Sequence, residues 1–158
     1  MTVEEIRAFT WDDISGMTFE QREEIGRTIY DSLTTLAHQF TRIRASWDVS
    51  ATGETNTFNI EIKYRYISRE KYDEKGYWLE KTKYDALMDA YNKTGSLPIF
   101  ITFLKDGIGY CWNLLDLQDL KWGKVLATSS TADGTYAKDK RYKEVCFPFP
   151  NQGREIKW

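Results

Sequence analysis

Glu61 and Lys63 place a carboxylate and an amine two positions apart in a very regular stretch of sequence. From Phe58 to Tyr66, apolar and polar side chains alternate without a break, which predicts a strand with one polar face. The period of two puts both groups on that face, roughly 6 to 7 Å apart along the chain. Together they could act on one phosphate or on one metal-bound water.

The spacing of an acid and a lysine carries little information alone. It recurs in three other places, namely Asp73 to Lys75, Asp119 to Lys121 and Glu155 to Lys157. The first of these lies in a charged stretch that suggests a loop, the second follows a predicted strand end, and the third adjoins the terminus. The long alternating strand therefore singles out Glu61 and Lys63.

A second alternating stretch precedes this strand. Arg42 to Val49 has the same period of two, and Ser50 to Thr57, with Gly53 at its middle, has the composition of a turn. Two strands joined by such a turn are typical of an antiparallel hairpin.

The register of this hairpin decides which polar groups meet. With the turn centred between positions 53 and 54, Trp47 faces Ile60 and Asp48 faces Asn59. Asp48 is then the diagonal neighbour of Glu61, roughly 7 to 8 Å away between backbones. Two carboxylate side chains can close that distance around a cation.

The same register pairs like charges. Arg44 faces Lys63 and Arg42 faces Arg65, pairs that destabilise an ordinary sheet. An anionic ligand would offset this cost, although a solvent-exposed hairpin face is the simpler alternative for the whole polar set.

Helical periodicity precedes the hairpin. Apolar residues at steps of three or four predict one amphipathic helix from Phe19 to about Phe40, with Thr18 and Gln21 at capping-box spacing. Its polar flank carries the acids Glu20, Glu23, Glu24 and Asp31. A solvated face explains these acids most simply; the alternative is that one of them reaches a metal. A short helix is predicted over Thr2 to Phe9.

Further elements follow. The sequence predicts a charged loop over Ile67–Gly76, a helix over Trp78–Thr94 that Gly95 ends, strands at Ile99–Leu104 and Ile108–Leu114 around a tight turn, and a flexible loop over Ala127–Thr135. The order is helix, strand, strand, loop, helix, strand, strand.

Composition excludes several classes of protein. The chain has 158 residues, which suits one domain, and no apolar stretch approaches the roughly 20 residues of a membrane span. Its acidic N-terminus does not resemble a signal peptide, so we expect a cytoplasmic protein.

A net charge of -2 disfavours coating of nucleic acid through bulk charge but allows a local basic groove.

Cysteine and histidine content disfavours other chemistry. Cys111 and Cys146 lack metal-site spacing and are expected to be reduced thiols. His38 is the only histidine and is expected on a helix surface, which disfavours both zinc and a histidine-dependent nucleophile. No glycine-rich phosphate loop is present in the sequence.

From Phe19 to Leu115 the chain resembles the PD-(D/E)xK nuclease superfamily. Asp48 matches its first acid, preceded by Trp47 where the family often has Pro, and Glu61 to Lys63 match its acid-x-Lys motif. The resemblance implies an α/β, restriction-endonuclease-like mixed sheet flanked by helices, in one domain over 1–158 with an extension at 116–158. Glu80 and Tyr84 are similar to the Gln-x-x-x-Tyr element of the RecB-like branch, with Glu in place of Gln.

The resemblance also implies roles. Asp48 and Glu61 would bind Mg²⁺ or Mn²⁺, because these ions prefer carboxylate oxygens as ligands and activate water. Lys63 would orient the attacking water and stabilise the negative charge that develops on the phosphate. The remaining expected site residues are Arg44, Arg65 and Lys83 for nucleic-acid binding, with Glu80 and Tyr84 in support. An equal alternative to these roles at the site is that Tyr84 belongs to the core and that Glu80 and Lys83 form a pair on the helix surface.

The expected function is metal-dependent hydrolysis of phosphodiester bonds in DNA rather than RNA. The alternative is a non-catalytic binding or inhibitor protein, such as a phage or mobile-element accessory, that keeps the nuclease scaffold. The oligomeric state stays open, with a dimer among the possibilities.

Overall fold

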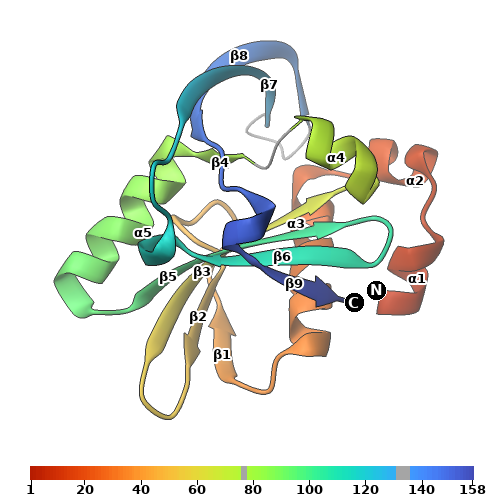
Figure 1. Cartoon of the computed structure of the whole chain (residues 1–158). Helices are drawn as coiled ribbons and strands as arrows, with labels where there is room; N and C mark the ends of the chain where they lie inside the picture. Colours follow the sequence, from red (N-terminus) through yellow and green to blue (C-terminus); the bar gives the residue numbers. More distant parts are fainter. Residues whose placement is uncertain (76–77, 131–135) are drawn as a thin grey trace.

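The computed structural model describes the backbone of residues 1–75, 78–130 and 136–158, and the side chains of residues 1–72, 78–126 and 142–158. Within these residues a six-stranded sheet forms the centre of the molecule (Figure 1). Its strands are β1 (Ala37–Phe40), β2 (Val49–Thr52), β3 (Thr57–Arg65), β5 (Leu97–Leu104), β6 (Ile108–Asn113) and β9 (Arg154–Lys157), and they lie in the order β1-β2-β3-β5-β6-β9.

The sheet is mixed. β3 and β5 are parallel, whereas the other neighbouring strands are antiparallel. The crossover between the two parallel strands contains α4 (Arg69–Lys75), the short strand β4 (Leu79–Glu80) and α5 (Lys81–Thr94). A parallel pair requires such a crossover because the chain must return to the same end of the sheet.

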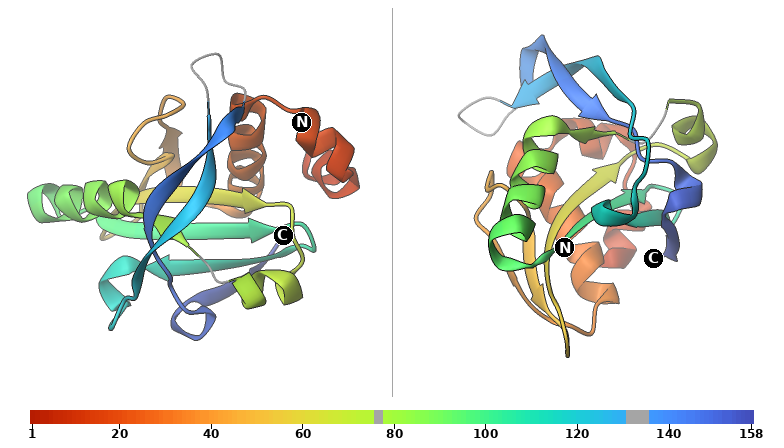
Figure 2. Two further views of the ribbon diagram at one scale, coloured as in Figure 1. Left: turned by 90° about the horizontal axis from the view of Figure 1, so that it is seen from above. Right: turned by 60° about the vertical axis from the view of Figure 1, so that its left-hand side comes forward.

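Helices cover both faces of the sheet (Figures 1 and 2). On one face α3 (Phe19–Leu33) packs against β3, beside the short helices α1 (Val3–Ala8) and α2 (Trp11–Gly16). On the other face α5 packs against β5 and β3. Alternate residues of β5 divide between the two cores, with Ile101 and Phe103 facing α3 and with Phe100 and Leu104 facing α5.

A smaller sheet stands away from the central one. β7 (Trp122–Ser130) and β8 (Tyr136–Cys146) form an antiparallel arm, and β4 pairs with the base of β8. Short 3₁₀ turns, Leu114–Asp116 and Pro150–Gln152, connect the arm to β6 and β9.

Several sequence predictions are confirmed. Thr18 and Gln21 form the capping box of α3, and Thr2 caps α1 in the same way. Gly95 ends α5 in the left-handed region with φ 77°, and Gly107 has φ 79° in the tight turn between β5 and β6. Both cysteines are free thiols.

The first predicted helix is too long. α3 ends at Leu33, and residues 37–40 form β1, so His38 lies in a strand and not on a helix. β1 pairs with β2, with Phe40 facing Val49. Local periodicity cannot reveal this change, because a strand partner far along the chain decides it.

The predicted strand over Arg42–Val49 is also wrong. Residues 41–48 form a loop in which Arg44 has φ 67°, and the strand begins only at Val49. The turn after β2 is centred one position later than expected, closed by a hydrogen bond from the Gly53 N–H to the Asn56 carbonyl. Val49 consequently faces Ile60, a register shifted by two residues.

Two further predictions need correction. The segment expected as a charged loop contains helix α4, and the helix expected from Trp78 begins at Lys81 because Leu79 and Glu80 pair with β8. The loop predicted over 127–135 is part of β7 as far as Ser130; residues 131–135 lie outside the described residues. No helix among the described residues has the length and apolarity to cross a membrane.

The contact between α3 and β3 generates a prediction. A Cβ atom added to Gly26 would lie 2.8 Å from Cγ2 of Ile62, a buried branched side chain, whereas one added to Gly16 meets nothing within 4 Å. We expect Gly26→Ala to lower the free energy of unfolding by about 1 to 3 kcal/mol, as overpacking typically does. Gly16→Ala, the matched control, should be neutral or slightly stabilising. Denaturant unfolding of both variants tests this; equal stabilities would contradict it.

Candidate active site

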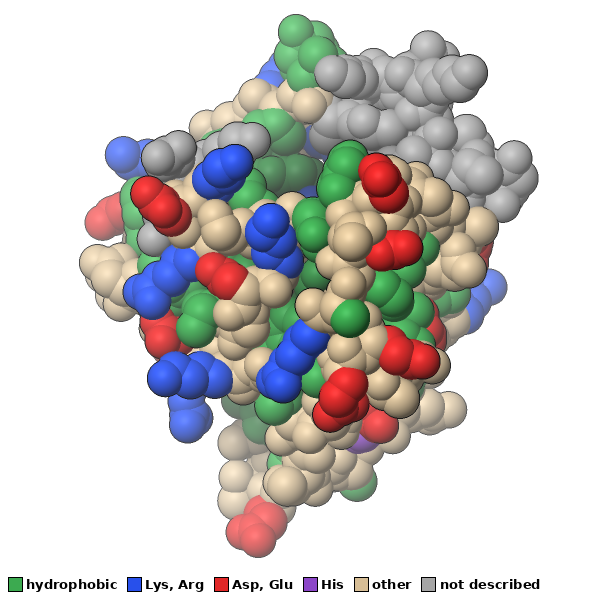
Figure 3. Space-filling view, turned by 90° about the vertical axis from the view of Figure 1, so that its right-hand side faces the viewer, with side chains coloured by type: hydrophobic (Ala, Val, Ile, Leu, Met, Phe, Trp, Pro, Cys, Tyr) green, Lys and Arg blue, Asp and Glu red, His purple; other side chains and the backbone are tan. Residues whose placement is uncertain are grey.

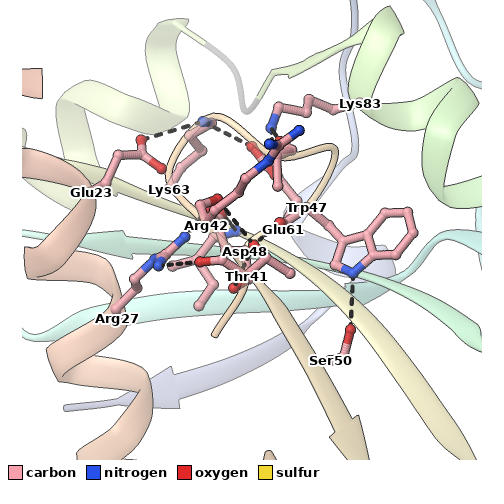
Figure 4. A network of polar contacts seen from close by, with 12 residues as sticks. Glu23, Arg27, Thr41, Arg42, Trp47, Asp48, Ser50, Glu61, Lys63 and Lys83 are labelled. Atoms are coloured by element: carbon pink, nitrogen blue, oxygen red, sulfur yellow. Dashed lines mark hydrogen bonds and ion pairs between the residues drawn. The ribbon is translucent and has the colours of Figure 1, made fainter. Parts of the chain in front are cut away.

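Three carboxylates converge near the start of β2 and the middle of β3 (Figure 4). Glu23 comes from α3, Asp48 from the loop before β2, and Glu61 from β3. Lys63 of β3 and Lys83 of α5 point into the same cluster. The structure therefore brings together groups that are separated by up to 60 positions in the chain.

Glu61 is the most deeply buried of these acids, with 0% of its surface exposed. Its Oε1 lies 2.8 Å from Nζ of Lys63, and its Oε2 lies 3.2 Å from Nζ of Lys83. Burial raises the pKa of Glu61, the positive charge of Lys63 opposes this rise, and the charge of Asp48 adds to it, so that the pKa remains above its usual value. Glu61 is thus a buried acid held by two ammonium groups.

Asp48 is fixed by backbone and side-chain donors. Its Oδ2 accepts a hydrogen bond of 2.8 Å from the Ile62 N–H, and its Oδ1 lies 3.4 Å from Nη2 of Arg27. Burial alone would raise the pKa of Asp48, but Lys63, the Ile62 N–H and Lys83 together hold it below its usual value. Asp48 is therefore ionised near neutral pH.

The register shift described above does not separate Asp48 from Glu61. Side chains alternate with a period of two, so a slip of two residues leaves every side chain on its expected face. Asp48 hydrogen-bonds to the backbone of Ile60 and Ile62 on either side of Glu61. The predicted proximity of the two acids is thus found, with a closer pairing than the predicted diagonal.

Glu23 is the helix acid that reaches this cluster. Its Oε1 lies 4.0 Å from Nζ of Lys63, and its carboxyl hydrogen-bonds to Asp48. Burial raises the pKa of Glu23 to about 7, opposed by Lys63 and reinforced by the charges of Asp48 and Glu61. The sequence offered four acids on this helix without distinguishing Glu23 from the others.

Arg27 lies one helical turn beyond Glu23, and the sequence did not indicate it. Besides contacting Asp48, its Nη1 donates a hydrogen bond of 2.7 Å to the Thr41 carbonyl. Arg27 is 7% exposed and therefore fastens the loop over residues 41–48 to α3. The sequence does nevertheless contain a signal for Arg27. Gly26 marks the side of α3 that approaches the sheet, and Glu23 and Arg27, four positions apart, lie next to it on neighbouring turns of the helix.

Lys63 carries a strongly stabilised positive charge. Burial would lower its pKa, but Glu61, Glu23 and Asp48 raise it above the usual value for lysine. Lys63 cannot act as a general base near neutral pH. Its ammonium can donate hydrogen bonds to water or to a phosphoryl oxygen.

Three acids and three basic groups thus contact one another in this network. Among the described residues, no group of three or more histidine, cysteine, aspartate and glutamate side chains is arranged to hold a metal ion. Mg²⁺ in proteins is usually held by one or two carboxylates together with water, so the oxygen donors of Asp48 and Glu61 fit this ion in kind and in number. Such binding would have to displace ammonium groups from Glu61.

The expected nucleic-acid-binding residues lie in different places. Lys83 belongs to the cluster, where its Nζ also donates a hydrogen bond of 2.7 Å to the Ala45 carbonyl. Arg44 lies on the adjoining loop, with its Nη2 3.9 Å from Glu20 and its guanidinium 5.1 Å from the Phe19 ring. Arg65 lies two positions beyond Lys63 at the end of β3.

The two expected supporting residues differ from each other. Glu80 forms an ion pair of 2.9 Å with Lys143. Burial would raise the pKa of Glu80, but Lys143, with smaller effects of Lys63 and Lys83, lowers it. Tyr84 packs edge-on against Trp122, with 5.2 Å between ring centroids, beside the core under α5. Tyr84 is therefore partly buried at the edge of that core, whereas Glu80 pairs with Lys143 and Lys83 pairs with Glu61 rather than with each other.

Comparison with known proteins supports the fold. No protein-family model matches the chain, and no curated protein matches it significantly. Among solved structures it is similar to Hjc, a Holliday junction resolvase from the archaeal hyperthermophile Archaeoglobus fulgidus. The TM-score is 0.54 with 13% sequence identity, and the match covers 86% of this chain and 92% of that chain. At this identity the likeness concerns the fold.

The central sheet is mixed, helices lie on both of its faces, and the likeness to Hjc spans most of both chains. The chain therefore has the restriction-endonuclease-like fold, which is the fold of the PD-(D/E)xK nuclease superfamily.

Proposed function

We propose that the chain is a metal-dependent nuclease that hydrolyses phosphodiester bonds of DNA in the cytoplasm. The observation that carries this proposal is the convergence of Asp48, Glu61 and Lys63 in one buried cluster on a nuclease fold. Asp48 and Glu61 would hold Mg²⁺ or Mn²⁺. When bound, this ion supplies neutralisation of phosphate charge and activation of water.

The residues of the chain have distinct tasks in this proposal. The Ile62 N–H holds Asp48 in one orientation. Lys63, permanently charged, donates hydrogen bonds to the attacking water or to a phosphoryl oxygen, where it stabilises the developing negative charge. Glu23, with a pKa of about 7, can accept a proton close to the site at neutral pH.

DNA is the preferred substrate in this proposal because the similar solved structure is a Holliday junction resolvase. Electrostatics requires the contact to be local. On the face shown in Figure 3, basic side chains lie mainly on the left and centre with acidic ones among them, and acidic side chains predominate on the right; the net charge of the chain is -2. Phosphate groups would then be held by individual basic residues near the cluster, Lys63 and Lys83 among them.

A second candidate function rests on the charge balance of the site. Arg27, Lys63 and Lys83 compensate the three acids without any bound ion. This arrangement also suits a non-catalytic binding or inhibitor protein that keeps the scaffold. Metal binding distinguishes the two candidates.

The first test is cleavage of DNA in the presence of Mg²⁺ or Mn²⁺. We expect Lys63→Ala and Glu61→Gln each to reduce the rate by about 10² or more, since a positioned charged group or ligand is lost. Lys93→Ala is the matched control, because Lys93 forms an exposed pair with Asp89 on the same helix as Lys83. Circular dichroism must show that all three variants are folded. Undiminished cleavage by both site variants would refute the assignment.

The second test is calorimetric titration with Mn²⁺. The wild-type protein should release or absorb heat in a saturable binding curve, and Asp48→Asn should weaken that binding because one carboxylate ligand is lost. Asp89→Asn removes an exposed acid of α5 and should leave the curve unchanged. Absence of wild-type binding would favour the non-catalytic candidate.

The third test concerns the proton on Glu23. Its pKa is higher in the folded protein than the ordinary value of 4.5, so the folded state binds more protons between these values and stability falls as pH rises from about 5 to 7. Glu23→Gln cannot ionise and should show a flatter decline. Melting temperatures measured with EDTA across this range test the expectation, with Glu24→Gln, an exposed acid of the same helix, as control. Parallel curves for Glu23→Gln and the wild type would contradict it.

A further inference from the structure

The arm of β7 and β8 exposes large apolar side chains to solvent. Tyr142 is 74% exposed, Leu126 is 53% exposed and Trp122 is 41% exposed. Leu126 pairs with Tyr142 across the two strands, and Trp122 lies four positions before Leu126 on β7. Cross-strand neighbours, and residues an even number of positions apart, point to the same side of a sheet. These three side chains and the exposed Lys124 therefore form one surface, called here the aromatic face of the arm.

Charge is unevenly distributed along the chain. From Lys121 to Cys146 the sequence contains six basic and three acidic residues, so this segment has a net charge of +3. Because the whole chain has a net charge of -2, the remainder carries -5. On the aromatic face Lys124 and Glu144 are exposed cross-strand neighbours. A basic segment in an otherwise acidic chain favours an anionic partner at that segment.

The base of the arm adjoins the candidate active site. Trp122 of the aromatic face packs against Tyr84, the residue after Lys83 on α5. On β8, Lys143 forms its ion pair with Glu80, directly before the start of α5. The arm consequently stands next to α5 and apart from the central sheet (Figure 2). A DNA strand that leaves the cluster along the first turn of α5 would therefore meet the arm.

We propose that the aromatic face of the arm binds unpaired bases of the DNA substrate beside the candidate active site. This inference rests on the proposed nuclease function and specifies DNA with a single-stranded portion as the substrate class. Tyr142 and Leu126 offer accessible apolar surface on which bases can stack, and stacking on aromatic rings is a general mode of single-strand binding. Lys124 lies between them and Trp122 and can pair with the phosphates. In a duplex the flat faces of the bases are covered by neighbouring bases, so this surface selects unpaired ones.

The test compares single-stranded DNA with blunt duplex DNA. Fluorescence anisotropy with labelled oligonucleotides of equal length, in EDTA to prevent cleavage, gives the Kd for each. Tyr142→Ala should weaken single-strand binding about tenfold because one stacked base is lost, whereas Tyr142→Phe keeps the ring and should bind as the wild type. Leu126→Ala should also weaken this binding. Leu33→Ala, the same change at an exposed leucine at the end of α3, is the matched control and should leave the Kd unchanged.

Salt dependence tests the role of the charge on this face. Lys124→Gln should reduce the slope of log K against log salt by about 0.7, as expected for one lost phosphate contact on a single strand. Lys93→Gln, at an exposed lysine paired with Asp89, is the control and should keep the slope. Because all of these side chains are exposed, each variant should keep the melting temperature of the wild type.

The outcomes separate this inference from the nuclease proposal. Equal single-strand affinity of the wild type and Tyr142→Ala would overturn the inference, as would an equal loss of affinity for both kinds of DNA in that variant. Wild-type protein that binds duplex DNA but not single-stranded DNA would overturn it as well. Cleavage of DNA would keep the nuclease proposal in each of these cases. Single-strand binding that depends on Tyr142, in a protein that cleaves no DNA with Mg²⁺ or Mn²⁺, would support the aromatic face and refute the nuclease function.

Discussion

The buried carboxylate of Glu61 is the constraint on which the arrangement of this region depends. A carboxylate with 0% exposure requires compensation from inside the protein, because a single uncompensated buried charge is strongly destabilising. Lys63 supplies part of it from the same strand and Lys83 supplies the rest from α5. Lys83 also binds the carbonyl of Ala45, so one ion-paired lysine links the strand, the helix on the other face and the loop that carries Asp48.

Helix α3, on the other face of the sheet from α5, completes this network with Arg27 and Glu23. Arg27 of α3 holds both Asp48 and the loop carbonyl of Thr41. Burial raises the pKa of Glu23 to about 7, so this acid of the cluster exchanges its proton near neutral pH.

Sequence periodicity revealed the part of the site that lies on one regular element. Glu61, Lys63 and the polar face of β3 followed from alternation alone, and Asp48 was placed on the correct face because the error in register was an even number. The long-range contacts were out of reach. Neither the strand character of residues 37–40 nor the left-handed backbone of Arg44 has a local signal that outweighs the competing patterns. The choice of Glu23 among four helix acids, and the role of Arg27, depend on which side of α3 approaches the sheet.

Ile62 joins the two faces of β3. Its side chain meets Gly26 on one face, its N–H fixes Asp48, and its two chain neighbours are Glu61 and Lys63. The packing of α3 on the sheet and the orientation of Asp48 therefore depend on the same residue. A substitution that shifts Ile62 in the interface between α3 and the sheet thus acts on the same residue whose N–H orients Asp48.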